Sequence, residues 1–462
     1  MGYSTVRRIM REGLTDPRNL DGIALWNSTR DVTDLTTDTG IKLWADKSGN
    51  SSTNVLVMGS GTGNRCSLTT GTAIGTGDFT ISGTFIVPPT AVTAGINSLS
   101  ASATTNNQAR AFYMETRATG DIWFTLIGAT TADFRSLRVA SIQSTYANQL
   151  ATVTFTRTGT TVAAYVTVAG VTATLSGSET TGGTPPAWSD TVTSTSTNIG
   201  FNATTEVMAG PMYYAAVYSA VLNAAGIIAN AAGTVQSNNV VFVDFTQQTK
   251  LDDSFTATSG QTVTITTSGA TGARISGARD LYQGTAANQP ILTIAAEGNY
   301  LTFDGSNDYL KAAAFSLSQP ETVYFAGSQV TWTDIDKIYD GNTPDSILLN
   351  QTTFGGGVSP RIGFYAGALT LTTDAMALGV NSIITTVANG ASGAIRYNRT
   401  SAVTGNAGSQ AGNGFTLGAR ADASRAGNIT AQEVLVYRTA QDENYQYRVT
   451  RLLSRRTGVL VA

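Results

Sequence analysis

Histidine is absent from this chain of 462 residues, and cysteine occurs once. Without histidine the chain cannot build the Ser/His and Cys/His nucleophile systems or most zinc sites, which excludes much hydrolase chemistry. One cysteine cannot form a disulfide within the chain, so packing has to supply the stability. We interpret Cys66 as a small buried apolar residue rather than a reactive thiol.

Charged residues are also scarce. The chain has 28 Lys and Arg residues and 31 Asp and Glu residues, which together make 13% of its length and leave a net charge of −3. Globular proteins usually carry about 25% charged residues. A charge this low gives no electrostatic footprint for nucleic acid or for an anionic membrane, and we expect neither as a partner.

Long apolar runs are missing as well. No stretch reaches the roughly 18 residues that span a bilayer, and the basic N-terminal segment lacks the apolar run of a signal peptide. We therefore expect a protein that is made in a cytoplasm, is not exported by the usual route and is not anchored in a membrane.

The abundant residues favour strands joined by tight turns. Glycine occurs 48 times, and Thr, Ser and Ala fill most remaining polar and small positions. Thr and Val suit pleated surfaces, whereas Gly breaks helices. Residues 79–87 alternate apolar and polar side chains and predict a half-buried strand, and residues 152–168, with a turn at Gly159, predict a hairpin. The length allows two large or three smaller domains.

An internal repeat decides the number of domains. Three blocks recur in the same order: residues 24–26 with 241–244, the hairpin regions after 148–150 and 381–383, and the strand 212–218 with 429–437. Trp26 and Val243 are 217 positions apart, and Tyr218 and Tyr437 are 219 apart. A nearly constant offset is what duplication produces. The repeat therefore predicts two modules of one topology.

The boundary between the modules is expected in the polar stretch 233–239, after the short apolar segment 222–232. This places an arm at residues 1–19, a first module at residues 20–236 and a second module at residues 237–462. A short helix is expected near the N-terminus, with Ser4 as cap and Gly13 as stop.

Residues 440–456 form the clearest helical pattern, with Thr439 as the expected cap and Gly458 as the stop. Its apolar residues fall on one face. Arginines are concentrated in this helix and in the N-terminal segment, which suggests an assembly interface with another subunit; the candidate residues are Arg7, Arg8, Arg11, Arg451, Arg455 and Arg456. The alternative for the C-terminal helix is that it packs on its own sandwich with a solvated basic face.

Several segments together are similar to one known family. Residues 303–310 read FDGSNDYL, residues 44–50 read WADKSGN and residues 77–81 read GDFTI. In this order they resemble the concanavalin A-like lectin/glucanase superfamily, in particular the laminin-G-like modules common in phage and bacterial surface proteins. The resemblance covers nearly the whole chain after residue 20. It implies an all-β fold of two tandem concanavalin A-like jelly-roll β-sandwiches with short N-terminal and C-terminal helices.

The same resemblance suggests weak candidates for ligand binding. Asp304, Asn307 and Asp308 could bind calcium, as some laminin-G-like modules do, or could simply close a tight turn around Gly305. Trp188 could stack on a sugar ring or could lie in the core. No other cofactor or metal is expected.

Catalysis is not expected. Glycosidases of the superfamily carry a strand with Glu-x-Asp-x-Glu, and that spacing does not occur here. We expect a non-enzymatic bacteriophage virion protein of a tail, fibre or capsid surface, which forms homo-oligomers and binds other virion proteins. A carbohydrate-binding adhesin that recognises host polysaccharide and a glycan-degrading enzyme are the alternatives.

Overall fold

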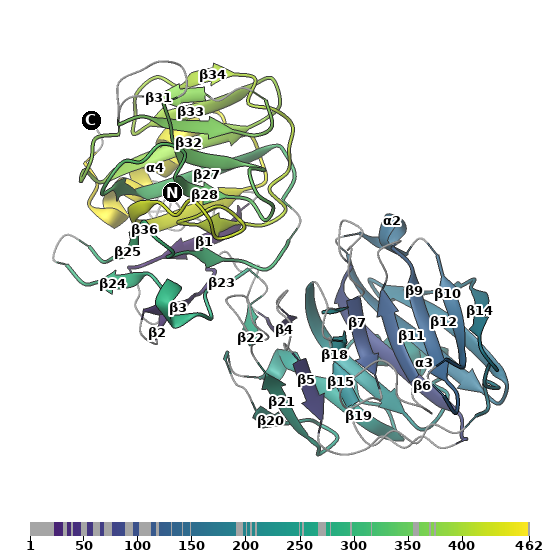
Figure 1. Cartoon of the computed structure of the whole chain (residues 1–462). Helices are drawn as coiled ribbons and strands as arrows, with labels where there is room; N and C mark the ends of the chain where they lie inside the picture. Colours follow the sequence, from purple (N-terminus) through teal and green to yellow (C-terminus); the bar gives the residue numbers. More distant parts are fainter. Residues whose placement is uncertain are drawn as a thin grey trace, which may run out of the picture. The chain divides into compact units, whose positions relative to one another are not determined.

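The chain forms two compact units, seen in Figure 1, which shows a computed structural model. It describes residues 23–30, 35–37, 40–47, 53–58, 65–68, 76–87, 96–100, 112–116, 120–130, 132–140, 142–147, 149–190, 197–199, 201–203, 206–207, 210–248, 250–251, 254–266, 274–277, 279–295, 298–315, 317–353, 360–368, 371–373 and 376–460. Unit 1 comprises Met1–Ser52 and Gly277–Ala462, and unit 2 comprises Thr53–Ser276.

Unit 1 is built on two antiparallel sheets. Sheet A has the order β24-β25-β36-β27-β32-β33-β34, with β1 also paired to β36: β1 (Ile23–Ser28), β24 (Ile291–Thr293), β25 (Tyr300–Asp304), β27 (Glu321–Gln329), β32 (Ser382–Ala388), β33 (Gly393–Tyr397), β34 (Val403–Gly405) and β36 (Asn428–Tyr437). Sheet B has the order β2-β3-β23-β26-β35-β28-β29-β30-β31: β2 (Leu35–Thr37), β3 (Ile41–Trp44), β23 (Leu281–Tyr282), β26 (Leu310–Lys311), β28 (Lys337–Asp340), β29 (Leu348–Gln351), β30 (Ile362–Tyr365), β31 (Leu371–Thr373) and β35 (Thr416–Leu417).

Unit 2 repeats this plan. Sheet C has the order β13-β12-β11-β6-β18-β4-β22, with β19 also paired to β18: β4 (Asn54–Met58), β6 (Phe79–Ile86), β11 (Leu150–Thr158), β12 (Thr161–Val168), β13 (Val171–Leu175), β18 (Gly210–Tyr218), β19 (Asn239–Asp244) and β22 (Arg274–Gly277). Sheet D has the order β14-β10-β9-β8-β7-β15-β5-β21-β20: β5 (Arg65–Leu68), β7 (Ile96–Ser100), β8 (Phe112–Thr116), β9 (Ile122–Ile127), β10 (Phe134–Val139), β14 (Ser178–Gly182), β15 (Thr197–Ile199), β20 (Ser254–Thr256) and β21 (Thr262–Thr266). A separate ribbon joins β16 (Phe201–Ala203) and β17 (Glu206–Val207).

Short helical segments complete the described chain: α2 (Ile142–Tyr146), α3 (Ala224–Ala231), α4 (Glu443–Thr457), and the 3₁₀ turns η3 (Phe245–Gln247) and η4 (Ala286–Asn288). The all-β fold of two β-sandwiches predicted from the sequence is confirmed. The predicted N-terminal helix lies outside the described residues.

The core of each unit lies between its two sheets. In unit 2, Phe79 stacks on Phe112 at 5.4 Å and Phe155 stacks on Phe124 at 5.2 Å between ring centroids, so aromatic residues join sheet C to sheet D. Cys66 is fully buried in this core, as expected, and burial raises the pKa of its thiol. Stacked apolar layers of this kind give a sandwich most of its stability.

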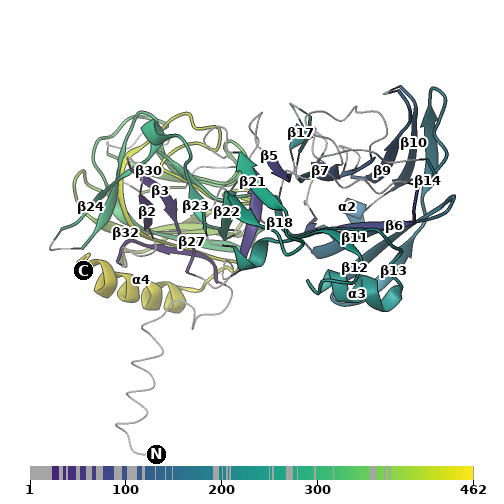
Figure 2. The same ribbon diagram turned by 90° about the horizontal axis from the view of Figure 1, so that it is seen from below.

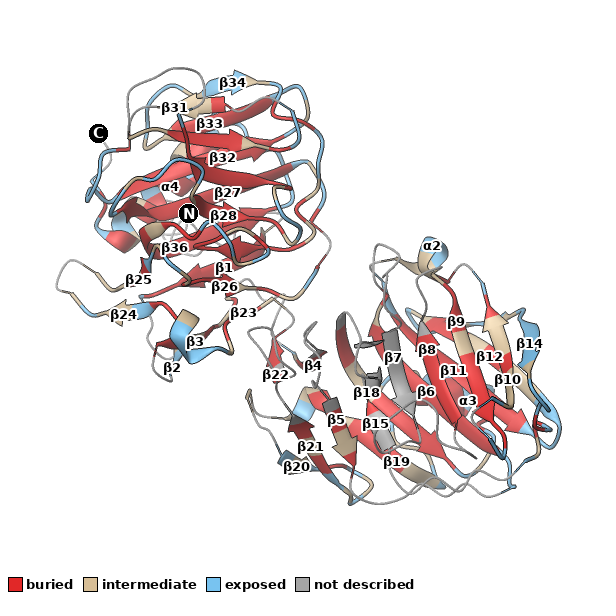
Figure 3. Ribbon diagram, viewed as in Figure 1, coloured by how far each residue is buried: buried red, intermediate tan, exposed pale blue. Residues whose placement is uncertain are grey.

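A helix covers the outer face of one sheet in each unit. In Figure 2, α4 lies beneath β27 and β32, and α3 lies beneath β12 and β13. Val449 and Leu453 of α4 pack on Leu435, and Ile227 of α3 packs on Tyr218. Strands β27 and β36 are therefore buried over nearly their whole length, as Figure 3 shows.

This helical cover corrects the predicted half-burial of residues 79–87. Strand β6 is buried on both faces as far as Phe85, because its polar side chains are enclosed as well. Ser82, for example, accepts a hydrogen bond at 2.7 Å from the Asn230 side chain of α3.

Helix α4 begins three residues later than the sequence predicted. Asp442, not Thr439, is the N-cap, and its side chain accepts a hydrogen bond at 2.8 Å from the backbone N–H of Tyr445. The carbonyl of Thr439 is engaged elsewhere, because it accepts a hydrogen bond from Thr322. Gly458 ends the helix with φ +75°, as predicted, since a left-handed residue there suits glycine.

Equivalent hydrogen bonds occur in the two halves of the sequence. The hydroxyl of Thr80 in β6 donates to the carbonyl of Ala220 and accepts from the N–H of Leu222. The hydroxyl of Thr322 in β27 makes the same two bonds with Thr439 and Gln441. Both partner pairs are 219 positions apart, which is the offset between Tyr218 and Tyr437.

The boundary between the units differs from the predicted division at residues 236 and 237. Strands β1 to β3 come from the first repeat but belong to unit 1, whereas β19 to β22 come from the second repeat but belong to unit 2. The repeat offset identifies equivalent strands but does not specify their pairing partners. Here β1 pairs with β36 and β19 pairs with β18.

Candidate functional site

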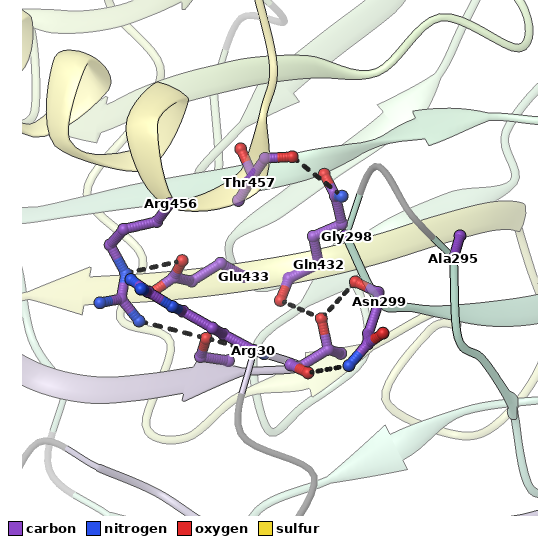
Figure 4. A pocket seen from close by; sticks show the side chains of 10 residues that line it. Arg30, Ala295, Gly298, Asn299, Gln432, Glu433, Arg456 and Thr457 are labelled. Carbon is purple, nitrogen blue, oxygen red and sulfur yellow. Dashed lines mark hydrogen bonds and ion pairs between the residues drawn. The ribbon is translucent and has the colours of Figure 1, made fainter.

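A small pocket opens in unit 1 where four separate parts of the chain meet (Figure 4). Its volume is about 150 Å³. The end of β1, the turn before β25, the middle of β36 and the end of α4 supply the lining residues, which are Ser28, Thr29, Arg30, Ala295, Gly298, Asn299, Gln432, Glu433, Arg456 and Thr457.

The pairing of β36 explains why a pocket forms there. One edge of β36 is shared by two strands, with β25 beside Asn428–Ala431 and β1 beside Glu433–Tyr437. Gln432 falls between the two ladders, at the junction. Its carbonyl accepts hydrogen bonds from the N–H of Thr29 at 2.9 Å and from the Thr29 hydroxyl at 3.0 Å. The junction therefore leaves a side-chain gap although the backbone stays hydrogen-bonded.

A buried ion pair forms one wall of the pocket. The Nε of Arg456 lies 2.7 and 3.0 Å from the two carboxylate oxygens of Glu433, and Trp26 Nε1 donates to Glu433 Oε1 at 2.7 Å. The guanidinium of Arg456 also covers the Trp26 ring at 5.0 Å from its centroid. Burial raises the pKa of the Glu433 carboxyl, and the Arg456 cation and the Trp26 N–H oppose that rise.

Neutral hydrogen-bonding groups form the opposite wall. The Thr29 hydroxyl donates to the carbonyl of Asn299 at 2.5 Å, and the Asn299 side chain donates to the carbonyl of Thr29 at 3.2 Å. Gly298 has φ +117°, and a Cβ atom there would lie 3.2 Å from Gln432 Nε2. Glycine at this position therefore allows the turn to approach β36 closely.

Among the described lining residues, Gln432 is the one with a buried polar atom that lacks a hydrogen-bond partner. Its Nε2 donates to the carbonyl of Thr457 at 3.2 Å, but its Oε1 is buried without a hydrogen-bond partner among the described atoms. The residue is only 3% exposed. A buried acceptor without a donor costs about 1–3 kcal/mol.

Trp188, a predicted sugar-stacking residue, lies in the core of unit 2. It is 4% exposed, its ring stacks on Phe124 at 5.8 Å and its Nε1 donates to Glu179 at 2.8 Å. The ring face is covered, so the core role that we had kept as the alternative is the one observed.

Asp304, Asn307 and Asp308 form the tight turn that was the alternative to a calcium site. Asp304 Oδ1 accepts from the N–H groups of Ser306, Asn307 and Asp308 at 2.7 to 3.4 Å, and Asp308 Oδ2 accepts from the N–H of Asp304 at 3.0 Å. Burial raises the pKa of Asp308 to about 6. Within the described ranges, no group of three His, Cys, Asp or Glu side chains could hold a metal ion.

The six arginines assigned to assembly fall into three classes. Arg7, Arg8 and Arg11 lie outside the described residues. Arg451 and Arg455 are exposed on α4, which leaves the assembly prediction open for them. Arg456 differs from these two, because its side chain turns inward to Glu433 and is only 11% exposed.

Sequence reasoning missed the pocket itself. A signal was present, since Gln432 and Glu433 interrupt an otherwise mostly apolar strand, and the equivalent positions of the first repeat are Tyr213 and Tyr214. Two polar residues in a strand that is buried on both faces need partners from other segments. Those partners come from the ends of β1 and α4, which the sequence pattern does not bring together.

No helix among the described residues is long and apolar enough to cross a membrane. No protein-family model matches the chain, and no curated protein sequence matches it.

Similar solved structures include a laminin chain and two proteins with carbohydrate-related descriptions. The mouse laminin α1 chain, domains LG4-5, is 10% identical, covers 83% of this chain and 89% of its own length, and has a TM-score of 0.29. A putative carbohydrate binding protein from Bacteroides ovatus is 13% identical over 49% of this chain and 60% of its own, with a TM-score of 0.33. The CBM40 of a Ruminococcus gnavus sialidase, bound to α2,3 sialyllactose, is 16% identical over 29% and 84%, with a TM-score of 0.24. Scores and identities this low assign no function to the chain, and the fold follows from its own sheets.

Proposed function

We propose that the chain is a non-catalytic, carbohydrate-binding structural protein of a bacteriophage particle, and that the pocket beside Gln432 holds one sugar residue of a surface polysaccharide. The observation that carries the proposal is the buried, unpartnered Oε1 of Gln432 in a pocket whose other walls are hydrogen-bonding groups. Sugar hydroxyls donate and accept hydrogen bonds equally well, so they can satisfy such a lining.

The size of the pocket supports one sugar residue rather than a larger ligand. Pockets for drug-sized molecules occupy about 300–1,000 Å³. This pocket has about 150 Å³. A single residue of a longer glycan can enter it while the rest of the glycan lies along the surface near Arg30, which is exposed at the edge of the lining.

The carboxylate arrangement supports binding over cleavage. Glycosidases of the usual type need two carboxyl groups about 5 to 9.5 Å apart, one as acid and one as nucleophile or base. Glu433 is the one carboxylate among the described lining residues, and both of its oxygens accept bonds from Arg456. The described lining therefore contains no second carboxyl group, and Glu433 is held by a cation.

The virion assignment comes from the sequence. The duplicated module, the low charge and the Thr-, Ser- and Gly-rich composition suit a rigid surface component of a particle, made in the host cytoplasm and assembled as a homo-oligomer with other virion proteins. Exposed Arg451 and Arg455 are candidates for that contact. Antibody labelling of purified particles in the electron microscope tests the location, and particles that lack the chain would contradict it.

Binding is tested on an array of bacterial surface oligosaccharides with matched variants. Gln432→Tyr places in the pocket the residue that stands at the equivalent position of the first repeat, and it should abolish binding by filling the gap. Tyr213→Gln makes the reverse change in unit 2 and should leave binding intact. Equal binding by the wild type and Gln432→Tyr would show that the pocket is not the site.

A further inference from the structure

The first repeat gives its first three strands, β1 to β3, to unit 1, and the second repeat gives its first four, β19 to β22, to unit 2. Strand β1 of the first repeat corresponds to β19 of the second, because residues 24–26 align with 241–244 at an offset of 217. The hairpin β2-β3 likewise corresponds to β20-β21, and each hairpin directly follows its first strand.

The edges that receive these strands are equivalent too. The last strand of the first repeat, β18, pairs with β4 through Gly210–Met212 and with β19 through Tyr214–Tyr218. The last strand of the second repeat, β36, pairs with β25 and with β1 in the same manner. A repeat that folded alone would place β1 on β18 and β19 on β36. The observed pairing is the reverse at both edges.

The exchanged strands lie inside the sandwiches that receive them. Ala24 and Leu25 of β1 are fully buried in the core of unit 1. Val241 and Val243 of β19 are fully buried in the core of unit 2, and Phe242 packs under α3. The hairpins extend sheets B and D, where β3 pairs with β23 and β21 pairs with β5.

We infer that the chain is a strand-exchanged pair of repeats fused head to tail, in which each repeat is the obligatory binding partner of the other. The surface that each repeat offers is the open edge of its last strand, and the partner it takes is the β-strand and hairpin that begin the other repeat. Such reciprocal exchange is the form that domain swapping takes between two copies of one protein.

The inference predicts that the halves stay together when the chain is cut between them. A protease site inserted between Gln236 and Ser237, outside α3 and β19, allows the folded protein to be nicked there. The two fragments should remain a one-to-one complex with the mass of the uncut chain by native mass spectrometry, and should separate only when denaturant unfolds them. Fragments that separate in native buffer and each keep a cooperative thermal transition would overturn the inference.

Engineered disulfides distinguish the two pairings directly. In a Cys66→Ala background, Leu25→Cys is combined with Val436→Cys, its register partner across β1 and β36. Residues paired across antiparallel strands have Cα atoms about 4.5–5.5 Å apart, within the range that a disulfide spans. The control combines Leu25→Cys with Val217→Cys, the position in β18 that corresponds to Val436.

The first variant should form a disulfide within one chain, and the control should keep two free thiols. Cross-linking in the control alone, or in neither variant, overturns the inference. A disulfide that joins two chains in the first variant also overturns it, because the exchange would then be between copies of the protein. Disulfide formation does not depend on the sugar pocket. If the proposed sugar binding proves wrong, the disulfide result still tests the strand exchange.

Discussion

The buried pair of Glu433 and Arg456 gives the sharpest test of how the pocket is held together. Replacing Arg456 with Met removes the cation and keeps much of the side-chain volume over Trp26. Glu433 is 1% exposed at its side chain, so it would be left as a buried carboxylate without its ion-pair partner. Breaking a buried pair from one side typically costs about 3–5 kcal/mol.

The expected loss is large in a thermal melt. For a domain of about 150–250 residues each kcal/mol shifts Tm by about 2–4 °C, so the Arg456→Met variant should melt about 6–20 °C lower at pH 7. The loss should shrink at pH 5, because the pKa of Glu433 is already raised by burial and rises further without Arg456, and a protonated carboxyl needs no cation.

Two further variants identify the cause. Arg455→Met changes the neighbouring arginine, which is exposed, and should alter stability by no more than about 0.5 kcal/mol. The double variant Glu433→Gln with Arg456→Met should lose less than Arg456→Met alone, since no charge is stranded. The reasoning is refuted if Arg456→Met costs no more than Arg455→Met, or if its cost is the same at pH 5 and pH 7.

Three other predictions concern stability and the pocket. Burial raises the pKa of Glu321 to about 8, and its Oε2 has no partner among the described atoms, so the folded state keeps a proton that the unfolded state loses above about pH 4.5. Stability should therefore fall as pH rises from about 4.5 to 8, by roughly 2–3 kcal/mol between pH 5 and 7, and urea unfolding of Glu321→Gln should lack this part of the slope; an unchanged slope would contradict it. Thr80→Val and Thr322→Val remove equivalent pairs of hydrogen bonds, so each should cost about 1–3 kcal/mol in urea unfolding, and clearly unequal costs would argue against equivalent roles. Gly298→Ala strains a backbone at φ +117° and narrows the pocket, so it should weaken glycan binding measured by calorimetry, whereas unchanged affinity would place the ligand elsewhere.

The sequence predicted the local elements well because local patterns decide them. The alternation and the turn at Gly159 identified the hairpin β11-β12, and Gly458 marked the end of α4. The offset of 219 between Tyr218 and Tyr437 aligned β18 with β36, which occupy matching places in sheets C and A.

The sequence could not assign partners to equivalent strands. Strands β1 and β19 share an apolar pattern, so either one suits the edge of either β18 or β36, and only tertiary packing decides between the two arrangements.

The same limit applies to Trp188, whose neighbours in sequence are prolines and polar residues although its ring contacts Phe124, 64 positions earlier in the chain. Gln432 is a visible polar interruption of β36. Its partners are distant in sequence, because Thr29 lies 403 positions earlier and Thr457 ends α4, 25 positions later.

The measurement that tests the central claim most directly is a crystal structure of the protein with an oligosaccharide that binds on the array. We predict one sugar residue in the pocket between β1, β25 and α4, with a hydroxyl group donating a hydrogen bond to Gln432 Oε1. A sugar bound at another surface, with this pocket empty and Gln432 Oε1 still without a donor, would contradict the proposed function.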